Sequence, residues 1–430
     1  MYLYSLFKKY PRICTDTRHI VKNSLFFALR GDNFNANAFA AQALEQGCAY
    51  AIVDEAQYAV NERFIVVDNA LEALQQLAQQ HRGALGTVIV GITGTNGKTT
   101  TKELIASVLS EKFNIHYTQG NLNNHIGVPL TLLQLTQTHK IAIVEMGANH
   151  PREIAALCSI AAPQYGLITN VGRAHLEGFG SFEGVMQTKS ELYEYIAGKG
   201  EAIFINSDNL FLNQMAENKG IGTKKRIEYS LTNTNSDVYG TTTGASPFLT
   251  MSCSLKNEKF DVKTNLIGEY NAENVLAAVC AGNFFGLKKE EIKRGLEKYK
   301  PSNSRSQLVE TQRNKLIMDT YNANPSSMRE AILNFAKLAA PHKTLILGDM
   351  LELGTISGEE HQKVVNLLNK SNLRNVFLVG KNFKNTENNC RCFENSDMLA
   401  EFLQTQHIDN QLILIKGSRG IQLEKTVKML

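Results

Sequence analysis

The 430-residue chain is 43% hydrophobic and 20% charged, which is ordinary for a globular protein, and its length predicts two or three domains. Its formal net charge is only +4, so nucleic acid is a weak candidate ligand and anionic small molecules suit the balance better. Seven scattered cysteines form no disulfide framework or zinc motif and indicate a reducing compartment. No apolar run has the length of a membrane span and residues 1–12 lack the regions of a signal peptide, so we expect a cytoplasmic protein.

Residues 1–82 are predicted to form a small α/β unit. Strands are expected at 24–29, 49–53 and 64–67, with a helix over 38–46 that ends at Gly47 and another over 71–80. The cluster 15–18 and the turn 30–32 lie near strand ends, where open α/β sheets bind ligands. On spacing alone these residues are more typical of helix caps and turns than of a ligand site.

The stretch GITGTNGKTTTKE at 91–103 is predicted to be a phosphate-binding loop between a strand and a helix. Gly94 and Gly97 would let backbone N–H groups converge on a phosphate, while Lys98 would neutralise its charge. Thr99 or Thr100 would offer a hydroxyl to Mg²⁺. A strict Walker A motif has glycine where this chain has Ile92, and this difference disfavours an ordinary GTPase. The GTNGKTT core between a strand and a helix still favours a nucleotide site over a structural turn.

Polar residues follow several other predicted strands of the segment 83–298. The strand 141–144 ends at Glu145, a candidate Mg²⁺ contact, and the strand 166–169 precedes a loop that contains His175. Lys189 falls on a helix, where a solvated position is the default expectation. The segment 226–266 alternates polar and apolar residues and predicts an antiparallel flap.

Two groups of asparagines in this segment leave two interpretations open. Asn123 and Asn124, in the loop 120–126, suit either ligand binding or turn formation. Asn271 and Asn274 share a helix face and suit either contact with a nucleotide base or capping of the helix.

The segment 299–430 is predicted to be a Rossmann-like domain. Its apolar runs at 315–318, 344–347, 375–379 and 411–415 alternate with helical stretches, as in a mostly parallel sheet. Polar loops follow three of these runs, at 319–325, 348–350 and 416–419. Because the carboxyl ends of parallel strands meet at one edge of a sheet, we expect these loops to form a binding crevice.

Seven motifs together resemble the Mur ligases of peptidoglycan synthesis. They are GTNGKTT (94–100), VEMGANHPREI (144–154), NVGRAHLEGFGS (170–181), YNAENVLAA (270–278), DTYNANPSSM (319–328), LGDMLELG (347–354) and LIKGSRG (414–420). The resemblance spans nearly the whole chain. It implies an α/β protein of three domains: a UDP-sugar substrate domain (1–82), a central P-loop-type ATPase domain with a mostly parallel sheet (83–298) and a Rossmann-like C-terminal domain (299–430).

The resemblance also implies the roles of individual residues. ATP would be bound by Gly94, Thr95, Asn96, Gly97, Lys98, Thr99, Thr100, Asn271, Asn274, Arg305 and Asp319. Mg²⁺ would be held by Thr99, Glu145, His175 and Lys189, with Lys189 carrying a carbamate. The catalytic set would be Lys98, His175, Lys189 and Arg305. The substrates would contact Thr17, Arg18, Arg30, Gly31, Asn123, Asn124, Asn322, Asn324 and Ser418.

YNANP and LGDMLELG indicate the branch that joins D-alanyl-D-alanine to UDP-MurNAc-tripeptide with ATP and Mg²⁺ through an acyl phosphate. A cytoplasmic bacterial enzyme, and a monomer, would follow. Another Mur ligase, a folylpolyglutamate synthase-like ligase and a nucleotide-binding protein without catalysis remain as alternatives. One departure concerns the substrate domain: the chain reads DNFNANAF where the family usually has Asp-Gly-His, which leaves the contacts of Asn35 and Asn37 open.

Overall fold

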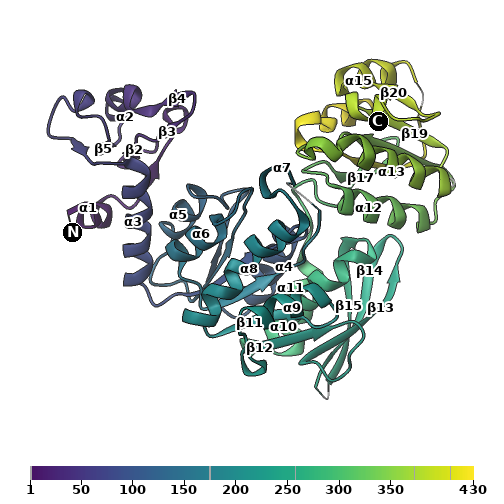
Figure 1. Cartoon of the computed structure of the whole chain (residues 1–430), viewed down its shortest axis with the longest axis horizontal. Coiled ribbons are helices and arrows are strands. Elements are labelled where there is room, and N and C mark those ends of the chain that lie inside the picture. The colour runs from purple at the N-terminus through teal and green to yellow at the C-terminus, as the bar shows by residue number, and fades with distance from the viewer. Residues whose placement is uncertain (1, 174–175, 257, 372, 407) are drawn as a thin grey trace.

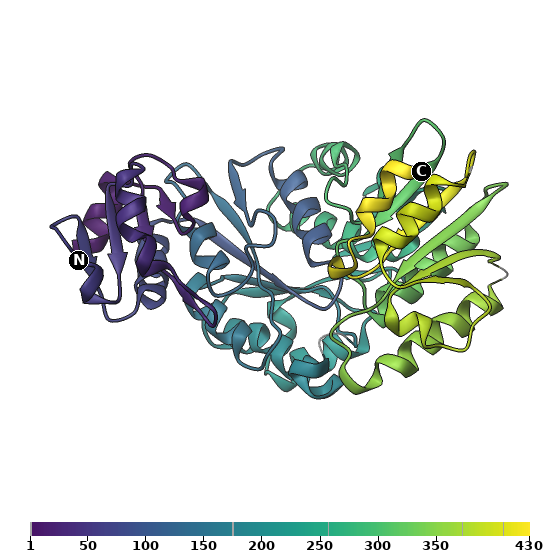
Figure 2. The same ribbon diagram turned by 90° about the horizontal axis from the view of Figure 1, so that it is seen from above.

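The computed structural model describes residues 2–173, 176–256, 258–371, 373–406 and 408–430. Within these residues the strands form sheets of four, nine and six strands in chain order, and one small two-stranded hairpin. The three larger sheets lie in separate lobes, with the N-terminal and C-terminal lobes at opposite ends of the middle one (Figures 1 and 2). Nearly all neighbouring strands of these sheets run parallel, so the predicted α/β class is confirmed.

The N-terminal lobe is a parallel sheet in the order β1-β2-β5-β6. Its elements are α1 (Tyr2–Lys9), β1 (Ile13–Cys14), β2 (Leu25–Phe27), β3 (Arg30–Gly31), β4 (Phe34–Asn35), α2 (Ala40–Glu45), β5 (Tyr50–Val53), β6 (Phe64–Val66) and α3 (Ala70–Ala84). Strand β2 is buried on both faces, as its continuous apolar run predicts. Helix α3 connects this sheet to the middle lobe, where Arg82 donates hydrogen bonds to the carbonyls of Ala161 and Ala162.

The middle lobe is built on the nine-stranded sheet, in the order β15-β14-β13-β12-β11-β10-β7-β9-β8. Its elements are β7 (Val88–Thr93), α4 (Lys98–Leu109), β8 (Ile115–Tyr117), α5 (Gly127–Leu132), β9 (Ile141–Glu145), α6 (Glu153–Ala161), β10 (Tyr165–Ile168), α7 (Leu176–Phe179), α8 (Phe182–Lys199), β11 (Ala202–Asn206), α9 (Leu210–Asn218), β12 (Arg226–Ser230), β13 (Val238–Ala245), β14 (Phe248–Leu255), β15 (Glu258–Ile267), α10 (Ala272–Phe284) and α11 (Lys289–Lys298). The predicted antiparallel flap is shorter than expected, because β12 pairs parallel with both β11 and β13. Only β13, β14 and β15 pair antiparallel there.

Helices cover both faces of the parallel part of this sheet. Successive residues of a strand point to opposite faces, so Ile89 of β7 packs with residues of α3, α6 and α8, while Val90 packs with residues of α4, α10 and α11. This two-sided burial explains why the strands read as continuous apolar runs in the sequence. It also leaves the strand ends as the place where polar side chains can gather.

The C-terminal lobe is a six-stranded sheet in the order β16-β17-β21-β18-β19-β20. Its elements are β16 (Gln307–Glu310), β17 (Lys315–Asp319), α12 (Pro325–Lys337), β18 (Lys343–Gly348), α13 (Ser357–Lys370), β19 (Asn375–Val379), α14 (Lys381–Lys384), β20 (Arg391–Phe393), α15 (Ser396–Gln404) and β21 (Leu412–Lys416). The four predicted strands form its parallel centre. The outer strands β16, which is antiparallel, and β20 were not predicted, because both are short and only partly apolar. No helix among the described residues is long and apolar enough to cross a membrane.

Candidate active site

A cleft of about 810 Å³ opens between the carboxyl ends of the middle strands and those of the C-terminal sheet. The phosphate loop forms one wall, and residues 319–330 with Lys416 form the facing wall. The predicted residues that line it are Gly94, Thr95, Asn96, Gly97, Lys98, Thr99, Thr100, Asn123, Asn124, Glu145, Lys189, Asn271, Asn274, Arg305, Asp319, Asn322 and Asn324. Residues far apart in the chain therefore meet in one site, whereas the predicted His175 lies outside the described residues.

The phosphate loop has the strand–turn–helix geometry that its sequence predicts. Gly94 and Gly97 adopt φ values of +144° and +78°, and α4 begins directly afterwards at Lys98. A Cβ atom at Gly97 would lie 2.7 Å from Asn274 Oδ1, so the loop tolerates only glycine there. The backbone N–H groups of Thr95 and Asn96 bond to Asn170 and shape the loop. The N–H groups of the first turn of α4 have no intrahelical acceptor and are left for a phosphate.

Lys98 is buried against the loop that it belongs to. Its Nζ donates hydrogen bonds to the carbonyls of Gly94 at 2.7 Å and Thr95 at 3.0 Å. Burial lowers the pKa of Lys98 to about 8, and the nearby Arg305 charge acts in the same direction. The ammonium thus lies above the glycines that would receive a phosphate, in a position where its charge is poorly solvated.

Glu145 lies at the end of β9 and is only 2% exposed. Its Oε1 accepts a hydrogen bond from Asn123 Nδ2 at 2.8 Å, whereas Oε2 is buried and has no hydrogen-bond partner. Lys102 Nζ lies 3.5 Å from Oε2 and donates to the Thr118 carbonyl at 2.6 Å. The sequence analysis missed Lys102, although its position four residues after Lys98 places both lysines on one face of α4.

Lys189 on α8 is 3% exposed, so the default expectation of a solvated lysine is wrong. Its Nζ lies 5.4 Å from the centre of the Phe179 ring. Burial lowers the pKa of Lys189 to about 7, and the positive charge of Lys98 lowers it further. The two lysines therefore both line the cleft, and burial shifts Lys189 toward its neutral amine form.

Asn271 and Asn274 join helix α10 to helix α4 through a chain of hydrogen bonds. Asn271 Nδ2 donates to the Ile267 carbonyl, Asn274 Nδ2 donates to Asn271 Oδ1, and Thr101 Oγ1 donates to Asn274 Oδ1, each at 2.9 Å. These bonds use one amide hydrogen of each asparagine, so each amide keeps a second donor for a ligand. Asn271 precedes α10 but its side chain forms no capping hydrogen bond, so the capping interpretation is not confirmed, and contact with a nucleotide base stays a prediction.

The C-terminal lobe contributes charged groups from the ends of β17 and β21. The guanidinium of Arg305 lies 3.7 Å from the centre of the Tyr321 ring, and its buried Nε has no hydrogen-bond partner. Asp319 Oδ2 accepts from Lys416 Nζ at 2.6 Å; the sequence analysis placed this lysine in the polar loop 416–419 but assigned it no role. Asn324 Nδ2 donates to Asn96 Oδ1 at 2.7 Å and so connects the C-terminal lobe directly to the phosphate loop.

Comparison with known proteins gives one consistent result. A model of the Mur ligase middle domain matches residues 92–282, and a model of the Mur ligase glutamate ligase domain matches residues 304–419. The chain is 34% identical over 431 residues to UDP-N-acetylmuramoyl-tripeptide–D-alanyl-D-alanine ligase of Bacillus subtilis (strain 168), across 97% of this chain and 92% of that protein. The chain belongs to the Mur ligase family. This relative places it in the branch of D-alanyl-D-alanine ligases that the sequence motifs indicated.

Solved structures of this branch share the fold of this Mur ligase. The crystal structure of MurF from Acinetobacter baumannii has a TM-score of 0.85 at 30% identity, covering 97% of this chain and 92% of that one. MurF from Thermotoga maritima in complex with ADP also has a TM-score of 0.85, at 25% identity, covering 97% and 96%. The mostly parallel central sheet is therefore the arrangement found in MurF structures.

The predicted substrate residues of the N-terminal lobe lie outside the cleft. Thr17 and Arg18 form a short 3₁₀ turn, in which Arg18 pairs with Asp16 at 2.7 Å and keeps an 83% exposed side chain. Arg30 and Gly31 form β3 of the two-stranded hairpin, and the Arg30 side chain is 49% exposed. These residues present exposed donors on the N-terminal lobe but do not touch the phosphate loop.

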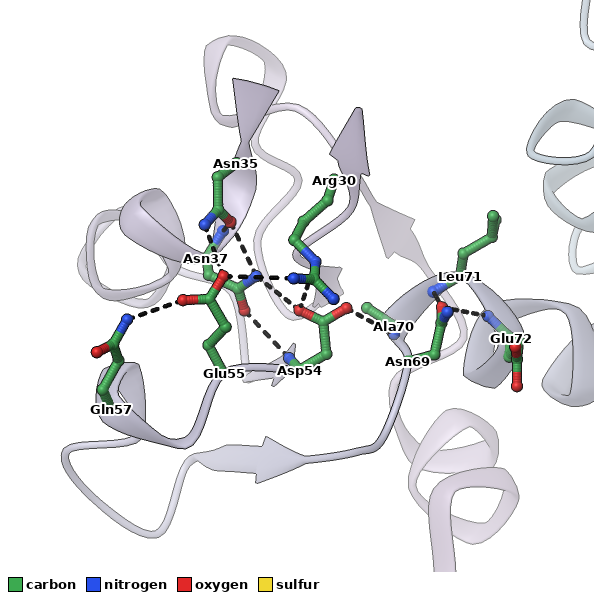
Figure 3. Close-up of polar contacts among 10 residues, drawn as sticks. All are labelled: Arg30, Asn35, Asn37, Asp54, Glu55, Gln57, Asn69, Ala70, Leu71 and Glu72. Carbon is green, nitrogen blue, oxygen red and sulfur yellow. Dashed lines mark hydrogen bonds and ion pairs between the residues drawn. The ribbon is translucent and has the colours of Figure 1, made fainter. Parts of the chain in front are cut away.

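A polar network fixes the hairpin of β3 and β4 beside the end of β5 (Figure 3). Arg30 lies 3.3 Å from Asp54 Oδ1, and the buried Asn37 donates to the same oxygen at 2.8 Å. Asn35 Nδ2 donates to Glu55 Oε1 at 2.7 Å. In this Mur ligase Asn35 and Asn37 of the departing DNFNANAF segment therefore stabilise the lobe itself, whereas Arg30 keeps an exposed side chain beside them.

Two other predicted substrate residues have mainly structural contacts. Ser418 is 3% exposed; its Oγ accepts from the Leu351 N–H at 2.9 Å and donates to the Ala323 carbonyl at 3.3 Å. Asn124 accepts from the N–H groups of Ile126 and Gly127 at the start of α5. Asn124 still lines the cleft, whereas Ser418 does not, so a contact of Ser418 with substrate remains a prediction.

Proposed function

We propose that this chain joins D-alanyl-D-alanine to UDP-MurNAc-tripeptide with consumption of ATP. One observation supports the proposal most strongly. The phosphate loop, Glu145 and Lys189 of the middle lobe line the same cleft as Arg305 and Asp319 of the C-terminal lobe. Forming an amide from a carboxylate in water is unfavourable, so the carboxylate must first receive a good leaving group. A nucleotide site that faces acceptor loops from a second lobe suits this two-step reaction.

In the first step the γ-phosphoryl group of ATP would be transferred to the terminal carboxylate of the tripeptide. Lys98 and the first turn of α4 would hold the phosphates, and Arg305 would neutralise the charge that develops during transfer. Asn271 and Asn274 would contact the adenine with their remaining amide hydrogens, and Asp319 would approach the nucleotide from the C-terminal lobe.

In the second step the amine of the dipeptide would attack the carbonyl carbon of the acyl phosphate. The C–N bond forms, the C–O bond to phosphate breaks, and inorganic phosphate leaves with one oxygen of the original carboxylate. The amine loses one proton in this step, which the released phosphate takes up. The hydrogen bond between Asn324 and Asn96 would hold the two lobes together and limit access of water, which would otherwise hydrolyse the acyl phosphate.

The residues at the end of β9 fit the Mg²⁺ that the family implies. Glu145 Oε2 is a buried carboxylate oxygen without a hydrogen-bond partner, and the buried Thr99 belongs to the phosphate loop, so both oxygen types that Mg²⁺ prefers are present. Glu145, Thr99 and the predicted His175 would hold the ion. When bound, Mg²⁺ would supply charge neutralisation at the phosphates.

A carbamate on Lys189 is part of the proposal. Carbamates form when a neutral amine adds to CO₂, and the buried position of Lys189 lowers its pKa to about 7 and so favours that amine. The product would be an anion beside Lys98, where an ammonium would repel both Lys98 and a metal. The modification therefore converts an unfavourable buried cation into a metal ligand.

We propose domains at 1–82, 83–298 and 299–430: the first boundary falls in the last turn of α3, which ends at Ala84, and the second precedes the turn-rich segment 300–304 between α11 and β16. The small-molecule substrates and the free cysteines support a cytoplasmic bacterial enzyme. We also propose that the enzyme acts as a monomer.

Phosphate release tests the function directly. The purified chain is incubated with ATP, Mg²⁺ and UDP-MurNAc-tripeptide, with and without D-alanyl-D-alanine. Phosphate release is measured, and the UDP-linked product is identified by mass spectrometry. We expect phosphate release that depends on the dipeptide, with one pentapeptide product formed for each phosphate. Release that ignores the dipeptide would indicate a non-ligating nucleotidase, and release that requires a folate would indicate a folylpolyglutamate synthase-like ligase.

A further inference from the structure

The C-terminal lobe carries several positive groups in or near the cleft. Lys416 is neutralised by Asp319 at 2.6 Å, and Arg329 lies 3.4 Å from Glu330. Arg305 is assigned to the nucleotide. Arg419 is exposed, and within the described parts of the chain it forms no ion pair. Arg419 does not itself line the cleft, so among the described residues it is an unpaired cation next to it.

Arg419 lies beside an aromatic ring of the cleft. Its guanidinium carbon is 5.6 Å from the centre of the Tyr321 ring, and that of Arg305 is 3.7 Å from the same ring. Tyr321 lines the cleft. Two guanidinium groups near one ring repel each other, so an anion bound beside them would be favoured by both charges.

The backbone next to Arg419 is held rigidly. The preceding residue, Ser418, is buried and bonds to the Leu351 N–H and to the Ala323 carbonyl, so it joins three loops of the C-terminal lobe. Lys416, two residues earlier, lies in the cleft and pairs with Asp319. These contacts place Arg419 at the edge of the cleft with little backbone freedom, as a pre-organised binding group requires.

We propose that Arg419 binds the terminal carboxylate of D-alanyl-D-alanine. This proposal rests on the proposed function. The dipeptide must keep its amine free for attack, so its carboxylate is the charged group left for recognition. A guanidinium matches a carboxylate with two parallel hydrogen bonds, which fixes orientation as well as supplying affinity. Arg305 is less suited to this role, because its Nε is buried whereas the Arg419 side chain is exposed.

The test compares two acceptors and two enzymes. Steady-state rates are measured for the wild type and R419A with D-alanyl-D-alanine and with its C-terminal amide, which lacks the negative charge. We expect R419A to lower kcat/KM for the dipeptide by about 10- to 100-fold, mainly through KM, as loss of a hydrogen bond to a charged group does. The same variant should change kcat/KM for the amide by less than about 3-fold, since the contact is already absent.

Two further variants define the result. R419K keeps the positive charge but loses the paired donors of the guanidinium, so its kcat/KM for the dipeptide should lie between those of R419A and the wild type. R391A serves as the matched control, because Arg391 lies 4.0 Å from the Phe402 ring in the same lobe but far along the chain from the cleft residues; it should behave as the wild type. An equal loss for both acceptors in R419A would overturn the proposal. Absence of any dipeptide-dependent ligation in the wild type would instead overturn the proposed function, so the two failures are distinguishable.

Discussion

Lys102 Nζ lies 3.5 Å from Glu145 Oε2, and neither side chain is more than 2% exposed. The two groups form a buried ion pair directly behind the phosphate loop. A buried ion pair contributes little net stability, but removing one partner leaves the other charge without compensation. Replacing either Lys102 or the proposed metal ligand Glu145 alone should therefore destabilise the fold.

Replacing Lys102 by methionine is expected to destabilise the protein by about 3–5 kcal/mol, because Glu145 loses its counter-charge and the Thr118 carbonyl loses its donor. Urea unfolding followed by circular dichroism measures this change. The double variant K102M/E145Q should regain a large part of the loss, since no uncompensated charge remains. A single variant as stable as the wild type would contradict the ion pair.

Gly97→Ala should abolish nucleotide binding while leaving the fold largely intact. The residue has φ of +78°, and the added Cβ would lie 2.7 Å from Asn274 Oδ1, so the loop must distort. Calorimetric titration with ADP measures the effect, and we expect affinity to fall by at least about 100-fold. Gly83→Ala is the matched control, since a Cβ atom added there would meet no other atom within 4 Å and the residue lies inside helix α3. Equal ADP affinity in both variants would contradict the assignment of the loop.

Lys189→Ala should be nearly inactive, and short carboxylic acids such as acetate or propionate should restore part of the activity. The reason is that the cavity left by the side chain can admit a carboxylate in place of the proposed carbamate. Activity of the wild type should also fall when CO₂ is removed and return when bicarbonate is added. Lys8→Ala, on the exposed end of α1, is the control: added acid should not change its activity, and it should depend on CO₂ as the wild type does. Full activity of Lys189→Ala without added acid would exclude the carbamate.

His361 should make stability depend on pH. It is fully buried and neutral: Nε2 accepts from the Met350 N–H at 3.0 Å, and Nδ1 donates to the Ser357 carbonyl at 2.7 Å. Burial lowers its pKa below the ordinary value, although Asp349 and Glu360 oppose the shift. His361 therefore binds a proton more readily in the unfolded chain than in the folded one, so the free energy of unfolding falls as the pH drops below about 6.5.

Unfolding free energies of the wild type and His361→Gln at pH 8 and pH 5.5 measure this contribution. The wild type should lose more stability on acidification than the variant, by up to about 1 kcal/mol. The exposed residue His150 gives the control variant His150→Gln, which should retain the slope of the wild type. A slope in His361→Gln equal to that of the wild type would show that His361 does not titrate in this range.

The sequence predicted the parts of this fold that depend on local pattern. Continuous apolar runs indicated the buried parallel strands, and the glycine spacing at 94–97 indicated the phosphate loop. The edge strands β16 and β20 were missed because they are short and half-exposed. The parallel pairing of β12 was missed because alternation of polar and apolar residues does not distinguish a parallel from an antiparallel neighbour.

The candidate site was harder to predict where it depends on burial. Lys102, Lys189 and Lys416 are almost completely buried, yet a lysine in a sequence reads as a solvated side chain. Only the packing of distant segments buries them, as the pairing of Lys416 with Asp319 across 97 residues illustrates. Likewise, Asn37 reads as a loop residue until its hydrogen bonds to Asp54 are seen.

Transfer of oxygen from substrate to phosphate tests the central claim most directly. UDP-MurNAc-tripeptide labelled with ¹⁸O in its terminal carboxylate is incubated with the enzyme, ATP, Mg²⁺ and D-alanyl-D-alanine, and the released phosphate is analysed by mass spectrometry. If an acyl phosphate forms in the cleft between the phosphate loop and Arg305, each phosphate released carries one ¹⁸O atom. Phosphate without the label would mean that ATP does not activate the carboxylate, and would contradict the proposed function.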